Sequence, residues 1–126
     1  MKIEYVNELL FANIKITYKG KTKNIDNVIV DTGAAHSLLS VDSVSDIGIS
    51  VNYGDSIVTM YGIGGEDYAF RRMVDKIELG SIEIENCYID FGMLDVRYGI
   101  NGLIGLDLLM REKVIIDLNI LRVFRS

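Results

Sequence analysis

Apolar and polar residues alternate with a period of two along most of the chain, which is typical of β-strands with one buried face. Alternation is clearest at residues 11–18, and a glycine-containing turn at 19–21 leads from there into a second strand that ends in the apolar run 28–30. After Asn86 the alternation slips by one residue, which predicts a β-bulge. The same pattern predicts three more pairs of strands, at residues 57–61 with 67–72, 77–79 with 82–84, and 114–116 with 120–124.

Two segments have helical spacing instead. Ser40 is placed to cap a short helix, with Asp42 in its first turn and Gly48 as its end. Apolar residues at helical spacing within 106–110 predict a second short helix that reaches about Lys113. The pattern therefore predicts a mostly β protein with one or two short helices.

Composition narrows the class of protein. The 126 residues are 49% hydrophobic and 25% charged, which predicts one globular domain over residues 1–126. The net charge is −5 and no basic run occurs, so we expect no nucleic-acid partner. No apolar stretch approaches the ~20 residues that span a bilayer, and no secretory signal is visible, so we expect no membrane partner.

Cysteine and histidine usage limits the chemistry further. Cys87 is the one cysteine, which rules out an internal disulfide and favours a reducing, cytoplasmic location. His36 is the one histidine, so a multi-histidine metal site within one chain is excluded. We interpret His36 as a structural or surface residue, and Cys87 as a small buried apolar residue.

The most informative motif is Asp31-Thr32-Gly33-Ala34, directly after the apolar run 28–30. A buried strand here delivers a carboxylate into a tight turn, as acid–base chemistry requires. Such a string occurs by chance in roughly one chain of this size in two hundred. The alternative is an ordinary turn at a strand end, because Asp, Thr and Gly all favour turns.

Two glycine motifs follow in the sequence. Gly62-Ile63-Gly64-Gly65 lies between two predicted strands and predicts a hairpin with a glycine-rich tip. It lacks the spacing of a phosphate-binding loop, although an ordinary hairpin loop remains an alternative. The second motif is Asn101-Gly102-Leu103-Ile104-Gly105 followed by the predicted helix.

With these three elements in this order, the sequence resembles the retropepsin-like aspartic proteases from about Phe11 to Phe124. The resemblance implies an all-β fold: a closed β-barrel with a β-hairpin flap and one or two short helices. It also implies an aspartic endopeptidase. Peptide hydrolysis by two carboxylates needs one ionised and one protonated group, and this chain has one Asp-Thr-Gly. The implied partner is therefore a second copy, with Asp31 of each subunit meeting on the two-fold axis of a homodimer.

The resemblance assigns catalytic roles to Asp31, Thr32 and Gly33. Thr32 would hydrogen-bond across the two-fold axis, and the backbone amide of Gly33 would approach the carboxylate. A peptide or protein substrate would bind as an extended strand under the flap. The implied substrate-binding residues are Ala34, Ala35, Gly62, Ile63, Gly64, Gly65 and Leu103, and Leu39 is a further candidate for a pocket. These apolar candidates indicate hydrophobic substrate residues around the scissile bond. No metal or organic cofactor is implied.

Some positions depart from the retroviral pattern. Ala34 cannot donate a hydrogen bond to the carboxylate as the hydroxyl of pepsin-like relatives can, so we expect a mildly acidic to near-neutral optimum rather than one below about pH 3.5. Ala35-His36 stands where retroviral enzymes tend to carry acidic residues. Leu106 follows Gly105 where many of them carry an arginine of an ionic network, which leaves the mode of dimerisation open.

Other interpretations remain. The same fold suits a catalytically silent dimeric module that binds extended peptides or partner proteins. A domain that works through a partner chain in a membrane or sporulation-type complex is a further alternative. We interpret Arg71-Arg72 as two solvated charges on a strand, and Asp107 as a residue that favours the dipole of the predicted helix.

Overall fold

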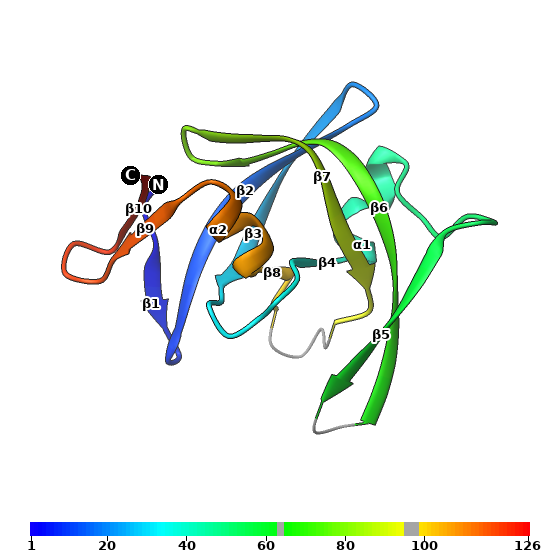
Figure 1. Cartoon of the computed structure of the whole chain (residues 1–126), viewed down its shortest axis with the longest axis horizontal. Coiled ribbons are helices and arrows are strands. Elements are labelled where there is room, and N and C mark those ends of the chain that lie inside the picture. Colours follow the sequence, from blue (N-terminus) through cyan, green and yellow to red (C-terminus); the bar gives the residue numbers. More distant parts are fainter. Residues whose placement is uncertain (63–64, 95–98) are drawn as a thin grey trace.

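The computed structural model of the chain describes residues 1–62, 65–94 and 99–126, and most of them lie in β-strands (Figure 1). The strands are β1 (Glu4–Val6), β2 (Leu9–Tyr18), β3 (Lys21–Val30), β4 (Leu38–Ser40), β5 (Ser56–Gly62), β6 (Gly65–Leu79), β7 (Ile82–Gly92), β8 (Gly102–Ile104), β9 (Val114–Asp117) and β10 (Arg122–Arg125). The helices are α1 (Val41–Val44), the 3-10 helix η1 (Ser45–Ile47) and α2 (Leu106–Arg111). This confirms the prediction of a mostly β fold with few, short helices.

One large sheet has the strand order β1-β2-β3-β8-β4-β7-β6-β5. Strand β2 pairs a second time, with β6, at the register Lys15↔Glu78, Ile16↔Ile77 and Thr17↔Lys76. Strands β9 and β10 form a separate antiparallel pair. An isolated bridge joins Lys2 to Arg122, and the Ile3 N–H donates to the Leu121 carbonyl at 3.1 Å, so the first residues of the chain lie along β10.

The predicted hairpins form where the turn residues allow them. Lys19 and Gly20 both have positive φ, 48° and 80°, which matches the twist of the strands β2 and β3 that they join. Gly80, with a φ of 61°, begins the turn between β6 and β7. In both turns a glycine stands between two alternating segments. The sequence pattern near each glycine was therefore sufficient to predict the turn.

Asparagines mark the irregular points of the two long hairpins. In β3 the pairing with β2 shifts by one residue next to Asn27, which has a φ of 53°. This bulge turns Val28 and Val30 toward the core. At Asn86 in β7, φ is 49° and the alternation slips as predicted, but the register with β6 is unchanged across it. The slip is therefore not a bulge, which would add a residue to one strand only. The alternation of buried residues in β6 shifts at the facing position as well.

The short strand β8 brings two distant segments together. It pairs in parallel with β3, with Val30 opposite Ile104, and antiparallel with β4, with Leu39 opposite Gly102 (Figure 1). The chain leaves β3 at Asp31 and leaves β8 at Gly105. Because parallel strands end at the same edge, the Asp31 turn and the start of α2 become neighbours.

The two helical segments agree with the predicted positions, with differences at their ends. Helix α1 continues into η1, and Gly48 ends it in the left-handed conformation with a φ of 91°. Ser40 occupies the N-cap position, but its hydroxyl makes no capping bond; instead Ser43 Oγ donates to the Ser40 carbonyl at 2.7 Å. Helix α2 ends at Arg111, about two residues before the predicted end.

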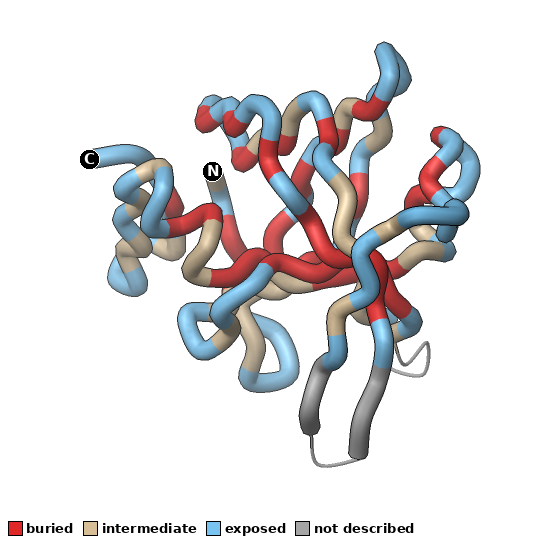
Figure 2. The backbone as a smooth tube through the Cα atoms, turned by 45° about the vertical axis from the view of Figure 1, so that its right-hand side comes forward, coloured by how far each residue is buried: buried red, intermediate tan, exposed pale blue. Residues whose placement is uncertain are grey.

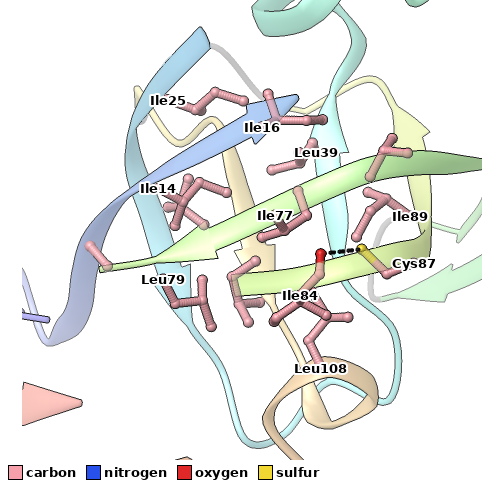
Figure 3. Close-up of a cluster of buried hydrophobic side chains, with 14 of the residues drawn as sticks. Ile14, Ile16, Ile25, Leu39, Ile77, Leu79, Ile84, Cys87, Ile89 and Leu108 are labelled. Carbon is pink, nitrogen blue, oxygen red and sulfur yellow. Dashed lines mark hydrogen bonds between the residues drawn. The ribbon is translucent and has the colours of Figure 1, made fainter. Parts of the chain in front are cut away.

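Figure 2 shows buried stretches of backbone where the long strands run together. Isoleucine is the commonest residue of this core (Figure 3). Ile16, Ile77 and Leu39 are fully buried there. Cys87 belongs to the same cluster, with 2% of its surface exposed, and its thiol donates to the Ile84 carbonyl at 3.7 Å. This confirms the expectation of a small buried residue. Among the described residues, no helix has the length and apolarity needed to cross a membrane.

Burial of Cys87 predicts a pH-dependent stability. Burial disfavours the thiolate and raises the pKa of Cys87 from 9.0 to about 11. As the pH rises through this range, the unfolded chain loses the thiol proton first, so the free energy of unfolding falls, on the order of 1 kcal/mol. In Cys87→Ala, the free energy of unfolding should fall less over the same pH range. Urea unfolding of both proteins at about pH 8 and about pH 10.5 measures it, and equal losses in the two would contradict it.

Candidate active site

The Asp31 turn is held by backbone hydrogen bonds at the end of β3. The Asp31 N–H donates to the Ile104 carbonyl at 2.9 Å, which continues the pairing of β3 with β8. The Gly33 N–H donates to Asp31 Oδ1, also at 2.9 Å. A Cβ at Gly33 would lie 3.1 Å from that carboxylate oxygen, so glycine permits the close approach. The half-buried carboxylate is thereby oriented by its own turn, next to the exposed Thr32.

Ser37 ties this turn to helix α2, and sequence reasoning missed it. The fully buried Ser37 donates from its backbone N–H to Asp107 Oδ2 at 2.9 Å and from its hydroxyl to Asp107 Oδ1 at 2.7 Å. The Gly105 N–H donates to the Ser37 hydroxyl at 3.0 Å, and the Asp90 N–H donates to the Ser37 carbonyl at 3.1 Å. Asp107 is therefore more than a dipole partner for α2: it accepts both donors of Ser37.

The start of α2 lies directly against the loop after Asp31. The Leu106 N–H donates to the Ala34 carbonyl at 2.8 Å, and the Asp107 N–H donates to the Ala35 carbonyl at 3.2 Å. A Cβ at Gly105 would lie 2.6 Å from the Ala34 carbonyl oxygen, closer than side chains approach in proteins. The contact between the loop after Asp31 and helix α2 therefore requires a glycine at position 105.

A cleft of about 520 Å³ opens beside this loop. Its walls come from the loop after Asp31, from β8, and from the facing strands β5, β6 and β7. The lining residues are Ala34, Ala35, His36, Leu38, Val58, Thr59, Arg71, Asp90 and Leu103. The lining begins three residues after Asp31, which itself is not among the lining residues.

The predicted substrate-binding residues fall into three groups. Ala34, Ala35 and Leu103 line the cleft. Gly62 and Gly65 form the last pair of the β5–β6 ladder, and Ile63 and Gly64 between them lie outside the described residues.

The prediction for Leu39 was wrong. Leu39 is fully buried in the core (Figure 3), and its neighbour Leu38 lines the cleft instead. Both leucines of β4 are buried, but only Leu39 belongs to the core cluster, and the sequence did not show which of the two would line the cleft.

The prediction of solvated charges at Arg71 and Arg72 was also wrong. Arg71 Nε donates to Asp90 Oδ1 at 2.7 Å and its Nη2 donates to Oδ2 at 3.2 Å, which raises the pKa of Arg71. Arg72 forms an ion pair with Asp55, and its side chain is only 10% exposed. Asp90 stands in an apolar run of β7 and is buried with it, with 5% of its surface exposed. A charged residue inside an apolar run indicates a buried charge, which needs a partner of opposite charge within the protein. This signal was present in the sequence.

The described residues contain no group of three or more His, Cys, Asp or Glu side chains that could hold a metal ion. His36 is exposed at the rim of the cleft, and no second histidine exists in the chain to join it.

An Asp-Thr-Gly turn at a strand end, beside a cleft in a mostly β fold, is typical of aspartic proteases. A family model of aspartyl proteases matches residues 14–108, and the chain belongs to this family. The crystal structure of a retropepsin-like aspartic protease from Rickettsia conorii is similar, with a TM-score of 0.65 and 22% identity over 98% of this chain and 97% of that chain. The fold is thus retropepsin-like. No curated protein matches the sequence.

Proposed function

We propose that residues 1–126 form one protease domain that acts as an aspartic endopeptidase in a homodimer, with Asp31 of each subunit as the catalytic dyad. The observation that carries this proposal is the Asp31 carboxylate, oriented by the Gly33 N–H at 2.9 Å beside a cleft of about 520 Å³. Membership in the aspartyl protease family supports it.

Three other aspartates among the described residues have partners of their own. Asp90 is bound by Arg71 on both oxygens, and Asp107 is bound by Ser37. Asp117 Oδ1 accepts the Asn119 N–H at 2.9 Å in the turn after β9. The engagement of these three groups elsewhere supports a second Asp31 as the partner carboxylate.

The dyad would work by sharing one proton. Two carboxylates about 3 Å apart do not both ionise near neutral pH, so one stays protonated and the other ionised. The ionised carboxylate takes a proton from a water molecule, which attacks the scissile carbonyl carbon. The protonated carboxyl donates its proton to the carbonyl oxygen, and a tetrahedral intermediate forms. Proton transfer to the amide nitrogen then breaks the C–N bond.

The surrounding structure supports the finer expectations of the family. The additional pairing of β2 with β6 supports a closed barrel. The pairing of Gly62 with Gly65 at the end of β5 and β6 supports a flap over the cleft. Under such a flap, a peptide would bind in extended form through main-chain hydrogen bonds. The cytoplasmic location stays a prediction, which cell fractionation would test.

The proposal predicts cleavage that depends on protein concentration. A diverse peptide library incubated at pH 4 to 7 should be cleaved, with specific activity rising as the concentration approaches and exceeds the dimer dissociation constant. Analytical ultracentrifugation over the same concentrations gives the fraction of dimer. Activity that follows this fraction supports the dyad. A stable dimer without cleavage would favour the silent peptide-binding module, and activity independent of the dimer fraction would contradict the shared dyad.

A further inference from the structure

The cleft beside the Asp31 turn is not uniformly apolar. Leu103, Leu38, Asp90 and Arg71 stand opposite one another on β8, β4, β7 and β6, so the lining changes from apolar to charged along this row. The end of the row at the Arg71–Asp90 ion pair is the polar end of the cleft. A cleft that bound only aliphatic side chains would gain nothing from a charged pair at one end. The polar end is therefore suited to a substrate group that can accept or donate hydrogen bonds.

Asp90 holds Arg71 in a fixed orientation. The Asp90 side chain is 7% exposed, and both of its oxygens accept hydrogen bonds from one edge of the guanidinium. Within the described part of the chain, Arg71 hydrogen-bonds to no residue other than Asp90. Its Nη1 group and one N–H of Nη2 are left to bind something else. The Arg71 side chain is 33% exposed, so a ligand in the cleft can reach it.

A second hollow of about 240 Å³ is lined by the same ion pair. His36, Arg71 and Asp90 line both spaces, and Arg111 lines the second one. Arg111 Nη2 donates to the Glu85 carbonyl at 2.6 Å, which leaves its charge without a carboxylate partner among the described residues. The polar end of the cleft thus offers the N–H donors of Arg71, while its carboxylate, Asp90, already accepts hydrogen bonds from Arg71.

We propose that Arg71, positioned by Asp90, is a specificity-determining residue that selects a substrate side chain with an accepting carbonyl oxygen, that of Gln or Glu. The proposal rests on the proposed protease function. A guanidinium donor to a side-chain oxygen is a strong, directional hydrogen bond. For the half-exposed Arg71 we expect roughly a tenfold preference for Gln or Glu over Met or Leu at the position that contacts this end. This differs from the hydrophobic preference expected from the sequence.

The test compares kcat/KM for peptides that carry Gln, Glu, Met or Leu at each position near the scissile bond. Arg71→Met alone leaves Asp90 as a buried, unpaired charge and endangers folding. The informative variant is therefore Arg71→Met/Asp90→Asn, which removes both charges together. The matched control is Arg72→Met/Asp55→Asn, which removes the neighbouring ion pair; adjacent strand residues point to opposite faces of the sheet.

We expect one position to prefer Gln or Glu about tenfold in the wild type and in the control, and to lose this preference in Arg71→Met/Asp90→Asn. Arg71→Lys should retain part of it, since the ammonium still donates. An aliphatic preference at every position, or a Gln or Glu preference that survives in the double variant, would overturn the inference. If no peptide is cleaved, the protease proposal fails. Calorimetric titration of the same peptides then tests the inference separately, by comparing the binding affinities of the Gln and Glu peptides with those of the Met and Leu peptides.

Discussion

Replacing Asp31 with Asn is expected to lower kcat/KM by roughly 10²–10⁴-fold or more, because the amide neither takes a proton from water nor shares one with its partner. The fold should survive. Asn has the same shape, and its Oδ1 can still accept the Gly33 N–H that now bonds to the Asp31 carboxylate at 2.9 Å. Cleavage of a library-derived peptide, together with thermal unfolding and sedimentation, measures both effects. Unchanged cleavage in a folded, dimeric Asp31→Asn protein would show that the activity has another source.

The same variant tests whether the second carboxylate comes from another copy. When a ninefold excess of Asp31→Asn is added to wild-type protein and the subunits exchange, only about a tenth of the wild-type subunits keep a wild-type partner. Activity should then fall to roughly a tenth, at concentrations where dimers are fully formed. A subunit that worked alone would keep its full activity in the mixture.

Gly105→Ala is expected to destabilise the protein and to impair cleavage together. The added Cβ would lie 2.6 Å from the Ala34 carbonyl oxygen and 3.1 Å from the His36 backbone, and a backbone atom cannot move aside as a side-chain tip can. Overpacking of this kind costs about 1–3 kcal/mol, which lowers the melting temperature by roughly 3–12 °C. Since the atoms that must move belong to the loop after Asp31, kcat should fall as well.

A matched control separates this steric effect from loss of glycine itself. A Cβ added at Gly20 would have no atom within 4 Å, and the φ of +80° there carries only the usual cost of a left-handed residue. Gly20→Ala should therefore leave kcat/KM unchanged, with a modest loss in melting temperature. A Gly105→Ala protein as active as Gly20→Ala would show that the loop tolerates the added methyl group.

Local signals were sufficient for the elements around the candidate site. Period-two alternation predicted β2, since a strand with one buried face must alternate. It predicted two strands, at residues 67–72 and 77–79, where the structure has the single long strand β6 (Gly65–Leu79). The Lys19-Gly20 turn and the helix end at Gly48 followed from residues that accept positive φ. The Asp31 motif stood out because an apolar run led directly into it.

Long-range packing decided the rest of the site. A three-residue strand such as β4 can turn either of two neighbouring residues toward the core. Packing against the other strands decided that Leu39 joins the core and that Leu38 lines the cleft. The partners of Ser37 and Arg71 lie 70 and 19 residues away along the chain. No local pattern encodes such pairs, because they depend on how β8 and β7 meet the loop after Asp31.

The sequence by itself determined most of the strand segments, the hairpin turns, the aspartyl motif and the resemblance to a protease family. The strands and turns depend on backbone preferences and hydrophobic periodicity, which act between near neighbours, and the resemblance rests on three motifs in a fixed order. Only the tertiary structure decided that Ser37 and Asp107 hold the Asp31 loop, and that Arg71 and Asp90 form a polar end to the cleft. Those contacts join residues that the parallel pairing of β3 with β8, and of β4 with β7, brings to one edge of the sheet.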